Sequence, residues 1–95
     1  PIRLLGLYNP FRAEGDARAY TRQVLLLWNV AIEEASLSTK GTVVVPTSDL
    51  FEERPERLSS DRFHPGPDGY VEIASRVVSS LPVSLVKTAE ARASR

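Results

Sequence analysis

The sequence predicts an α/β fold, and three stretches of the 95-residue chain indicate it. Residues 2–8 form an apolar run suited to a buried strand, and residues 42–46 form a second, β-branched one. Between them, from Asp16 to about Ser38, apolar side chains recur at helical spacing. A strand, a long helix and a second strand predict a right-handed βαβ unit with parallel strands.

The first strand is apolar on both faces and ends at Asn9-Pro10, where proline stops it. Asp16 is expected to cap the helix that follows. One helical stripe should face the core, and Tyr20 and Trp28 are therefore expected to be core residues and not a ligand platform. The stripe comprises Ala17, Tyr20, Val24, Leu27, Trp28, Ala31 and Ala35, widened by Leu25 and Ile32.

The opposite side of this helix is polar and includes Asn29. Leu26, Val30 and Leu37 lie near that polar side, which an isolated surface helix would not favour. Lys40-Gly41 is expected to end the helix, with a cation in its last turn and a glycine able to adopt the left-handed conformation.

After the second strand, residues 47–60 read as a charged, solvated loop. Asp49 follows the strand directly and could be an active-site acid, but an Asx-turn or a helix cap is the simpler interpretation. Pro67 suits the first position of a second amphipathic helix. Its apolar stripe comprises Tyr70, Ile73, Ala74, Val77, Val78 and Leu81, and residues 82–95 could form a further short helix or a tail.

Composition narrows the function classes. Twelve basic residues balance twelve acidic ones, so no net charge attracts nucleic acid or an anionic membrane. The chain has no cysteine, and its single histidine argues against a zinc site. No apolar run approaches the ~20 residues that span a bilayer, and no signal-peptide pattern is present. The sequence has no methionine and enters a strand directly after Pro1, as we expect of a fragment.

The only histidine lies in the segment Asp61-Arg62-Phe63-His64-Pro65. One tight turn can bring the carboxylate of Asp61 to one imidazole nitrogen, leaving the other free as a base, which is the base-and-orienter half of a nucleophilic triad. Histidine suits this task because it exchanges protons near neutral pH. Pro65 keeps His64 out of the helical region, which fixes it on a loop. A surface or capping histidine is the alternative interpretation.

With these residues identified, the chain resembles the C-terminal half of an SGNH hydrolase, also called a GDSL-type lipase or esterase. The last motif of that family is Asp-x-x-His-Pro followed by a helix with an early Gly-Tyr. Asp61, His64, Pro65, Gly69 and Tyr70 match it in order. The opening Leu-Leu-Gly-Leu-Tyr-Asn-Pro-Phe at residues 4–11 and Trp28-Asn29 resemble one bacterial branch, so the resemblance covers about residues 2–81.

The resemblance implies the last two parallel strands and flanking helices of a three-layer α/β/α, flavodoxin-like sandwich, with residues 1–81 belonging to the hydrolase domain. It implies His64 as the general base and Asp61 as the residue that fixes its tautomer, with no cofactor or metal. The nucleophilic serine and the oxyanion-hole residues would lie in a missing N-terminal half. Ser48, Ser59 and Ser60 are ordinary loop serines, and Asn9 and Asn29 are expected to be structural.

Three functions therefore remain open. The first is a serine esterase or lipase fragment acting on an ester and paired with its missing half or with another copy. The second is a small α/β binding or interaction module in which Asp61 and His64 stabilise a turn. The third is a metal-dependent site built from Asp49, Asp61 and His64.

Overall fold

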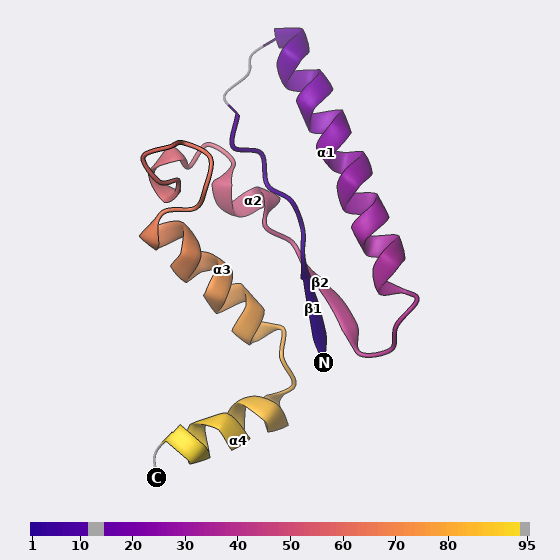
Figure 1. Cartoon of the computed structure of the whole chain (residues 1–95), viewed down its shortest axis with the longest axis vertical. Helices are drawn as coiled ribbons and strands as arrows, with labels where there is room; N and C mark the ends of the chain where they lie inside the picture. Colours follow the sequence, from indigo (N-terminus) through magenta and orange to yellow (C-terminus); the bar gives the residue numbers. More distant parts are fainter. Residues whose placement is uncertain (12–14, 94–95) are drawn as a thin grey trace.

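The computed structural model of the chain describes residues 1–11 and 15–93, and over these ranges it shows a mixed α/β protein (Figure 1). The elements follow the predicted order of strand, long helix, strand and helix, and residues 83–93 form a further helix. In chain order they are β1 (Ile2–Leu5), α1 (Gly15–Ser36), β2 (Thr42–Val45), α2 (Ser48–Phe51), the 3₁₀ helix η1 (Pro55–Arg57), α3 (Pro67–Ser79) and α4 (Val83–Ala93). The prediction of a solvated loop at 47–60 is wrong, because residues 48–51 and 55–57 form short helices and Leu50 and Phe51 are buried.

The two strands pair in parallel, which confirms the predicted strand direction. Ile2 lies opposite Thr42, and Leu5 lies opposite Val45. The strand β1 is shorter than the predicted 2–8, although Gly6 still donates its N–H to the carbonyl of Val45 at 2.9 Å. The carbonyl of Gly6 in turn accepts the hydroxyl of the buried Thr47 at 2.6 Å.

Helices lie on both sides of the strands, with α1 on one side and α3 on the other (Figure 1). The helix α1 packs against β2, and α3 packs against η1 and α2. The guanidinium of Arg3 joins β1 to the end of α3, because its Nη2 donates to the carbonyl of Ser80 at 2.7 Å. The buried apolar core is small and comprises Val45, Leu50 and Phe51.

The predicted core face of α1 is only partly correct: Leu25 and Ile32 at its margin are half-buried, but most of the central stripe is exposed. Tyr20 is 69% exposed and Trp28 is 61% exposed, so neither is a core residue in this chain. The side turned to the sheet also includes Asn29, which is half-buried, and Ser36, which is buried. The helix is apolar around most of its circumference, so helical periodicity alone could not choose the face that packs.

The predicted ends of α1 also need correction. Asp16 lies in the first turn of α1 and not at its N-cap position. The helix ends at Ser36, and its last turn contains no basic residue, so Lys40 lies beyond the last turn and not in it as predicted. Gly41 does adopt a left-handed conformation, at φ 84°, but it does so at the entry to β2.

Among the described residues, no helix combines the length and the apolar character needed to cross a membrane.

Candidate active site

The histidine lies on a loop closed at its base, which we call the His loop (residues 58–66). Leu58 and Pro65 form an antiparallel bridge, and the N–H of Ser59 donates to the carbonyl of His64 at 2.8 Å. The N–H of Gly66 donates to the carbonyl of Arg57 at 2.7 Å. These backbone bonds fix both ends of the loop, so the side chains on it are held in a defined place.

The start of α3 closes the C-terminal end of the His loop. Gly66 is the N-cap residue and Pro67 the first helical residue, which confirms the predicted position of the proline. A Cβ at Gly66 would lie 2.9 Å from the carbonyl oxygen of Leu58. Glycine therefore allows the two strands of the loop base to approach this closely.

Asp61 and His64 are in direct contact, as their spacing predicts. The Oδ2 of Asp61 lies 2.5 Å from the Nδ1 of His64. The other carboxylate oxygen, Oδ1, accepts the hydroxyl of Ser59 at 2.5 Å and the backbone N–H groups of Phe63 and His64 at 2.9 and 3.0 Å. The carboxylate thus holds the loop backbone with one oxygen and the imidazole with the other.

This arrangement keeps Asp61 ionised. The hydrogen bond with His64, followed by those with Ser59 and the N–H of Phe63, holds the pKa of Asp61 far below its usual range. A carboxylate at Nδ1 selects the tautomer with its proton on that nitrogen, which leaves Nε2 able to accept a proton. The imidazole is 66% exposed, so a reacting group could approach it.

The His loop lies beside the segment that leaves β1. The hydroxyl of Tyr8, three residues past the end of that strand, donates to the carbonyl of Phe63 at 2.7 Å. Because β1 and β2 are parallel, their carboxyl ends lie side by side, and the segments that follow the two strands meet there. The carboxyl ends of the strands are the usual location of sites in open α/β sheets.

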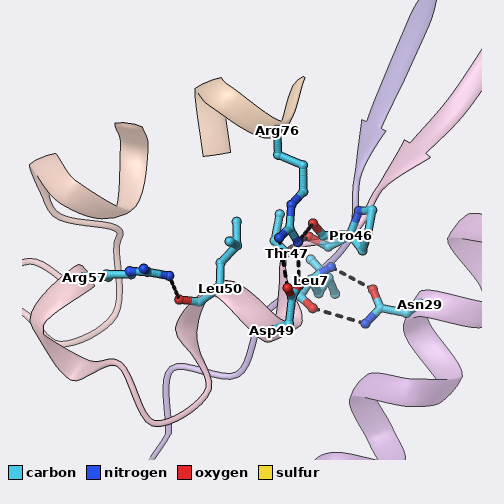
Figure 2. A network of polar contacts seen from close by, with 9 residues as sticks. Leu7, Asn29, Pro46, Thr47, Asp49, Leu50, Arg57 and Arg76 are labelled. Atoms are coloured by element: carbon cyan, nitrogen blue, oxygen red, sulfur yellow. Dashed lines mark hydrogen bonds and ion pairs between the residues drawn. The ribbon is translucent and has the colours of Figure 1, made fainter. Parts of the chain in front are cut away.

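Asp49 does not belong to this cluster. It lies in the first turn of α2, and the guanidinium of Arg76 binds both its oxygens, at 2.5 and 2.9 Å (Figure 2). Arg76 also donates to the carbonyl of Pro46 at 3.1 Å. The hydrogen bond with Arg76 lowers the pKa of Asp49. The expected Asx-turn or helix cap is therefore wrong, and Asp49 instead joins α2 to α3.

The ion pair of Asp49 also removes the basis for the metal-dependent alternative. Within the described ranges, no group of three or more His, Cys, Asp or Glu side chains is placed to hold a metal ion.

The two asparagines singled out from the sequence bind backbone groups. The Oδ1 of Asn9 accepts the N–H of Phe11 at 2.9 Å. The amide of Asn29 reaches from α1 to Leu7, where it accepts the N–H at 2.7 Å and donates to the carbonyl at 3.1 Å (Figure 2). Both contacts are structural, as predicted.

Sequence reasoning missed two residues of the site. Ser59 was interpreted as an ordinary loop serine, yet its hydroxyl binds the carboxylate of Asp61. An Asp two residues after a Ser in a turn-rich loop is a weak signal for such a bond. Tyr8 was assigned only to the first strand, and no local pattern relates it to Phe63.

A groove of about 580 Å³ lies between α1 and the region of α2, and its lining includes neither Asp61 nor His64. Two ion pairs join its walls: Arg22 to Glu52 at 3.1 Å and Arg18 to Glu53 at 3.8 Å. The groove borders the His loop at Leu58 but does not contain the two proposed catalytic side chains.

A scan against models of known protein families finds no match to this chain, and a search of curated proteins finds no similar protein. The fold and the site therefore define this chain as a mixed α/β protein with an exposed histidine that is oriented by a carboxylate.

Proposed function

We propose that this chain is part of a serine esterase or lipase of the SGNH type and supplies the base and the orienting acid of its catalytic triad. The observation that supports this is the 2.5 Å contact between Asp61 Oδ2 and His64 Nδ1 on an exposed loop. The nucleophilic serine and the oxyanion hole come from polypeptide outside this sequence.

In the proposed reaction, Nε2 of His64 accepts the proton of the serine hydroxyl while the serine oxygen attacks the ester carbonyl. The protonated imidazole then donates this proton to the leaving alkoxide, and an acyl-serine remains. Water attacks the acyl-serine with the same base, which releases the acid and restores the serine. Asp61 holds the tautomer of His64 and stabilises the imidazolium, and this chemistry needs no metal or cofactor.

The test uses the chain extended upstream so that the serine segment is included, with p-nitrophenyl acetate as substrate. His64→Ala should lower kcat by several orders of magnitude, and Asp61→Asn somewhat less, because triad residues act as a unit. Asp68→Asn is the matched control: this exposed acid lies four residues after His64 in the first turn of α3. Wild-type kcat in His64→Ala, with a normal melting curve, would show that the assignment is wrong.

One observation favours a second candidate, a small α/β binding module. Besides the imidazole of His64, Asp61 binds the Ser59 hydroxyl and the backbone N–H groups of Phe63 and His64, as expected of a turn-stabilising residue. On this interpretation the extended wild-type protein turns over no ester, and Asp61→Asn changes only the stability of the loop.

We also propose that the outer edge of β1 is covered by polypeptide, either the rest of the same hydrolase domain or a second copy. Ile2 donates its N–H to the carbonyl of Gly41, and Gly6 donates its N–H to that of Val45, so both point towards β2. Because successive residues of a strand point their backbone groups in opposite directions, those of Arg3 and Leu5 point to the outer edge of β1. The described residues provide no strand that pairs there. An open strand edge favours pairing with another chain.

Exposed side chains on α1 support the same proposal. Leu26 is 63% exposed and Leu37 is 85% exposed, and with Val30 they line one shallow groove. Burying a large apolar side chain stabilises a protein by about 1.5 to 3 kcal/mol, and a small domain has only about 5 to 15 kcal/mol in total. Light scattering after size exclusion, with mass spectrometry of the sample, should therefore find a complex. A cooperatively folded 10.5 kDa monomer at micromolar concentration would contradict this proposal.

A further inference from the structure

Tyr8 joins three parts of the chain that are far apart in sequence. It follows β1, and its ring stacks on that of Phe51 from α2, with centroids 4.1 Å apart and an interplanar angle of 27°. Phe51 is itself buried, so the tyrosine ring rests on a fixed support. From this position the Tyr8 hydroxyl donates to the carbonyl of Phe63 in the His loop.

The acceptor carbonyl belongs to the peptide group that links Phe63 to His64. The N–H of that same peptide group, on His64, donates to Oδ1 of Asp61 at 3.0 Å. Tyr8 and Asp61 therefore hold opposite ends of one planar peptide group, the oxygen and the hydrogen respectively. Because this plane carries the Cα of His64, fixing it restricts the direction in which the imidazole leaves the backbone.

The neighbouring aromatic ring adds to this restraint. The ring of Phe63 meets the imidazole of His64 edge-on, with centroids 5.1 Å apart and an interplanar angle of 77°. Phe63 also donates its N–H to Oδ1 of Asp61. The residue whose carbonyl Tyr8 holds thus also contacts the two members of the proposed triad.

We propose that Tyr8 is a positioning residue for His64: through the Phe63 carbonyl it orients the imidazole so that Asp61 can hold Nδ1. The catalytic role of Tyr8 rests on the proposed hydrolase function, whereas its effect on the orientation of the imidazole does not. The phenol suits a donor role, because burial, followed by the nearby Tyr70 and Asp61, raises the pKa of Tyr8 and keeps its proton in place at neutral pH.

The first experiment is nitrogen NMR of the imidazole in Tyr8→Phe, in whichever assembly the chain forms. The chain has one histidine, so its ring signals have a single source. The phenylalanine keeps the ring that stacks on Phe51 and removes only the hydroxyl. We expect the fraction of the Nδ1–H tautomer to fall. Tyr20→Phe is the matched control, because that tyrosine lies on α1 and is 69% exposed; its tautomer fraction should equal that of the wild type.

The second experiment measures ester turnover by the same variants of the upstream-extended protein. Misplacing a catalytic group by about 1 Å can cost up to about 100-fold in rate, so Tyr8→Phe should lower kcat by about 10- to 100-fold with KM unchanged. An unchanged tautomer fraction together with an unchanged kcat would overturn the inference and leave the proposed function standing. Absence of turnover in the extended wild type would instead reject the proposed function, and the tautomer fraction would still decide the role of Tyr8.

If Tyr8→Phe does not fold, the inference is tested on the wild-type protein instead. Nuclear Overhauser contacts between the Tyr8 ring and the backbone protons of Phe63 and His64 are expected from the 2.7 Å hydrogen bond. Their presence supports the inference, and their absence overturns it.

Discussion

Replacing Gly69 by alanine should open the base of the His loop. Gly69 is buried in the first turn of α3, and a Cβ there would overlap the carbonyl oxygen of Arg57 and lie 2.9 Å from Cε1 of Phe51. The overlap with the Arg57 carbonyl is the more severe of the two, because that group is backbone and also accepts the N–H of Gly66 at 2.7 Å. To admit the methyl group, α3 and η1 must separate, which breaks the hydrogen bond that closes the loop.

The expected loss of stability combines three effects. Overpacking a tight contact costs about 1 to 3 kcal/mol. The hydrogen bond to Arg57 contributes about 1 kcal/mol. Alanine recovers about 0.5 to 1 kcal/mol relative to glycine inside a helix. The net loss is therefore about 1 to 3.5 kcal/mol. Since each kcal/mol shifts the Tm of a domain this small by about 4 to 8 °C, the change is readily measured.

Thermal and urea unfolding of Gly69→Ala should be compared with the wild type at one protein concentration, because association changes apparent stability. Ser75→Ala is the matched control: it is an exposed position on the same helix, where we expect a change within about 0.5 kcal/mol. If Gly69→Ala has the same Tm and urea midpoint as Ser75→Ala, the close approach of α3 to Arg57 does not hold the loop as we have argued.

Three further outcomes can be measured. The lowered pKa of Asp61 means that its stabilisation is complete above its unfolded pKa of about 3.9 and is lost as pH falls towards the folded value. The stability difference between wild type and Asp61→Asn, from urea unfolding, should thus be constant above about pH 5 and shrink below about pH 4, and a decline only on raising the pH would contradict this. Arg76→Lys should lower stability by less than about 1 kcal/mol, because its partner Asp49 is 62% exposed, and a larger loss would show that this pair supports the fold more strongly than we infer. The chain without upstream sequence should not hydrolyse p-nitrophenyl acetate above background, since it lacks the proposed oxyanion hole; turnover that disappears in His64→Ala would place the nucleophile within this chain.

The elements predicted from the sequence were those that depend on local patterns. The β-branched run at 42–46 and the helical spacing after Asp16 each suffice to define an element, and parallel pairing follows from joining two strands through a long helix. The contact of Asp61 with His64 was also predictable, because both lie within one turn. Ser59 lies in the same turn, but a hydroxyl can bind many neighbours, so its choice of Asp61 depends on the loop conformation.

The orientation of α1 could not be predicted for a physical reason. Apolar residues occupy two sides of this helix, one containing Trp28 and the other containing Leu26 and Leu37, and periodicity selects the more apolar side. The side that packs on the sheet combines the half-buried Leu25 and Ile32 with Asn29, whose amide binds both backbone groups of Leu7. A polar residue can thus orient a helix where no other group satisfies the backbone next to it.

The same contact limits where another strand can add to β1. Strand alternation places the backbone groups of Leu7 on the outer edge that Arg3 and Leu5 share, and at Leu7 the Asn29 amide occupies the donor and the acceptor that a neighbouring strand would use. A strand that adds to this edge can therefore pair at Arg3 and Leu5 and must end before Leu7. Beyond that point the chain continues to Tyr8, whose hydroxyl is committed to the His loop. The free edge and the proposed triad residues are thus separated by two residues with fixed hydrogen bonds, so that pairing at the edge need not disturb the orientation of His64.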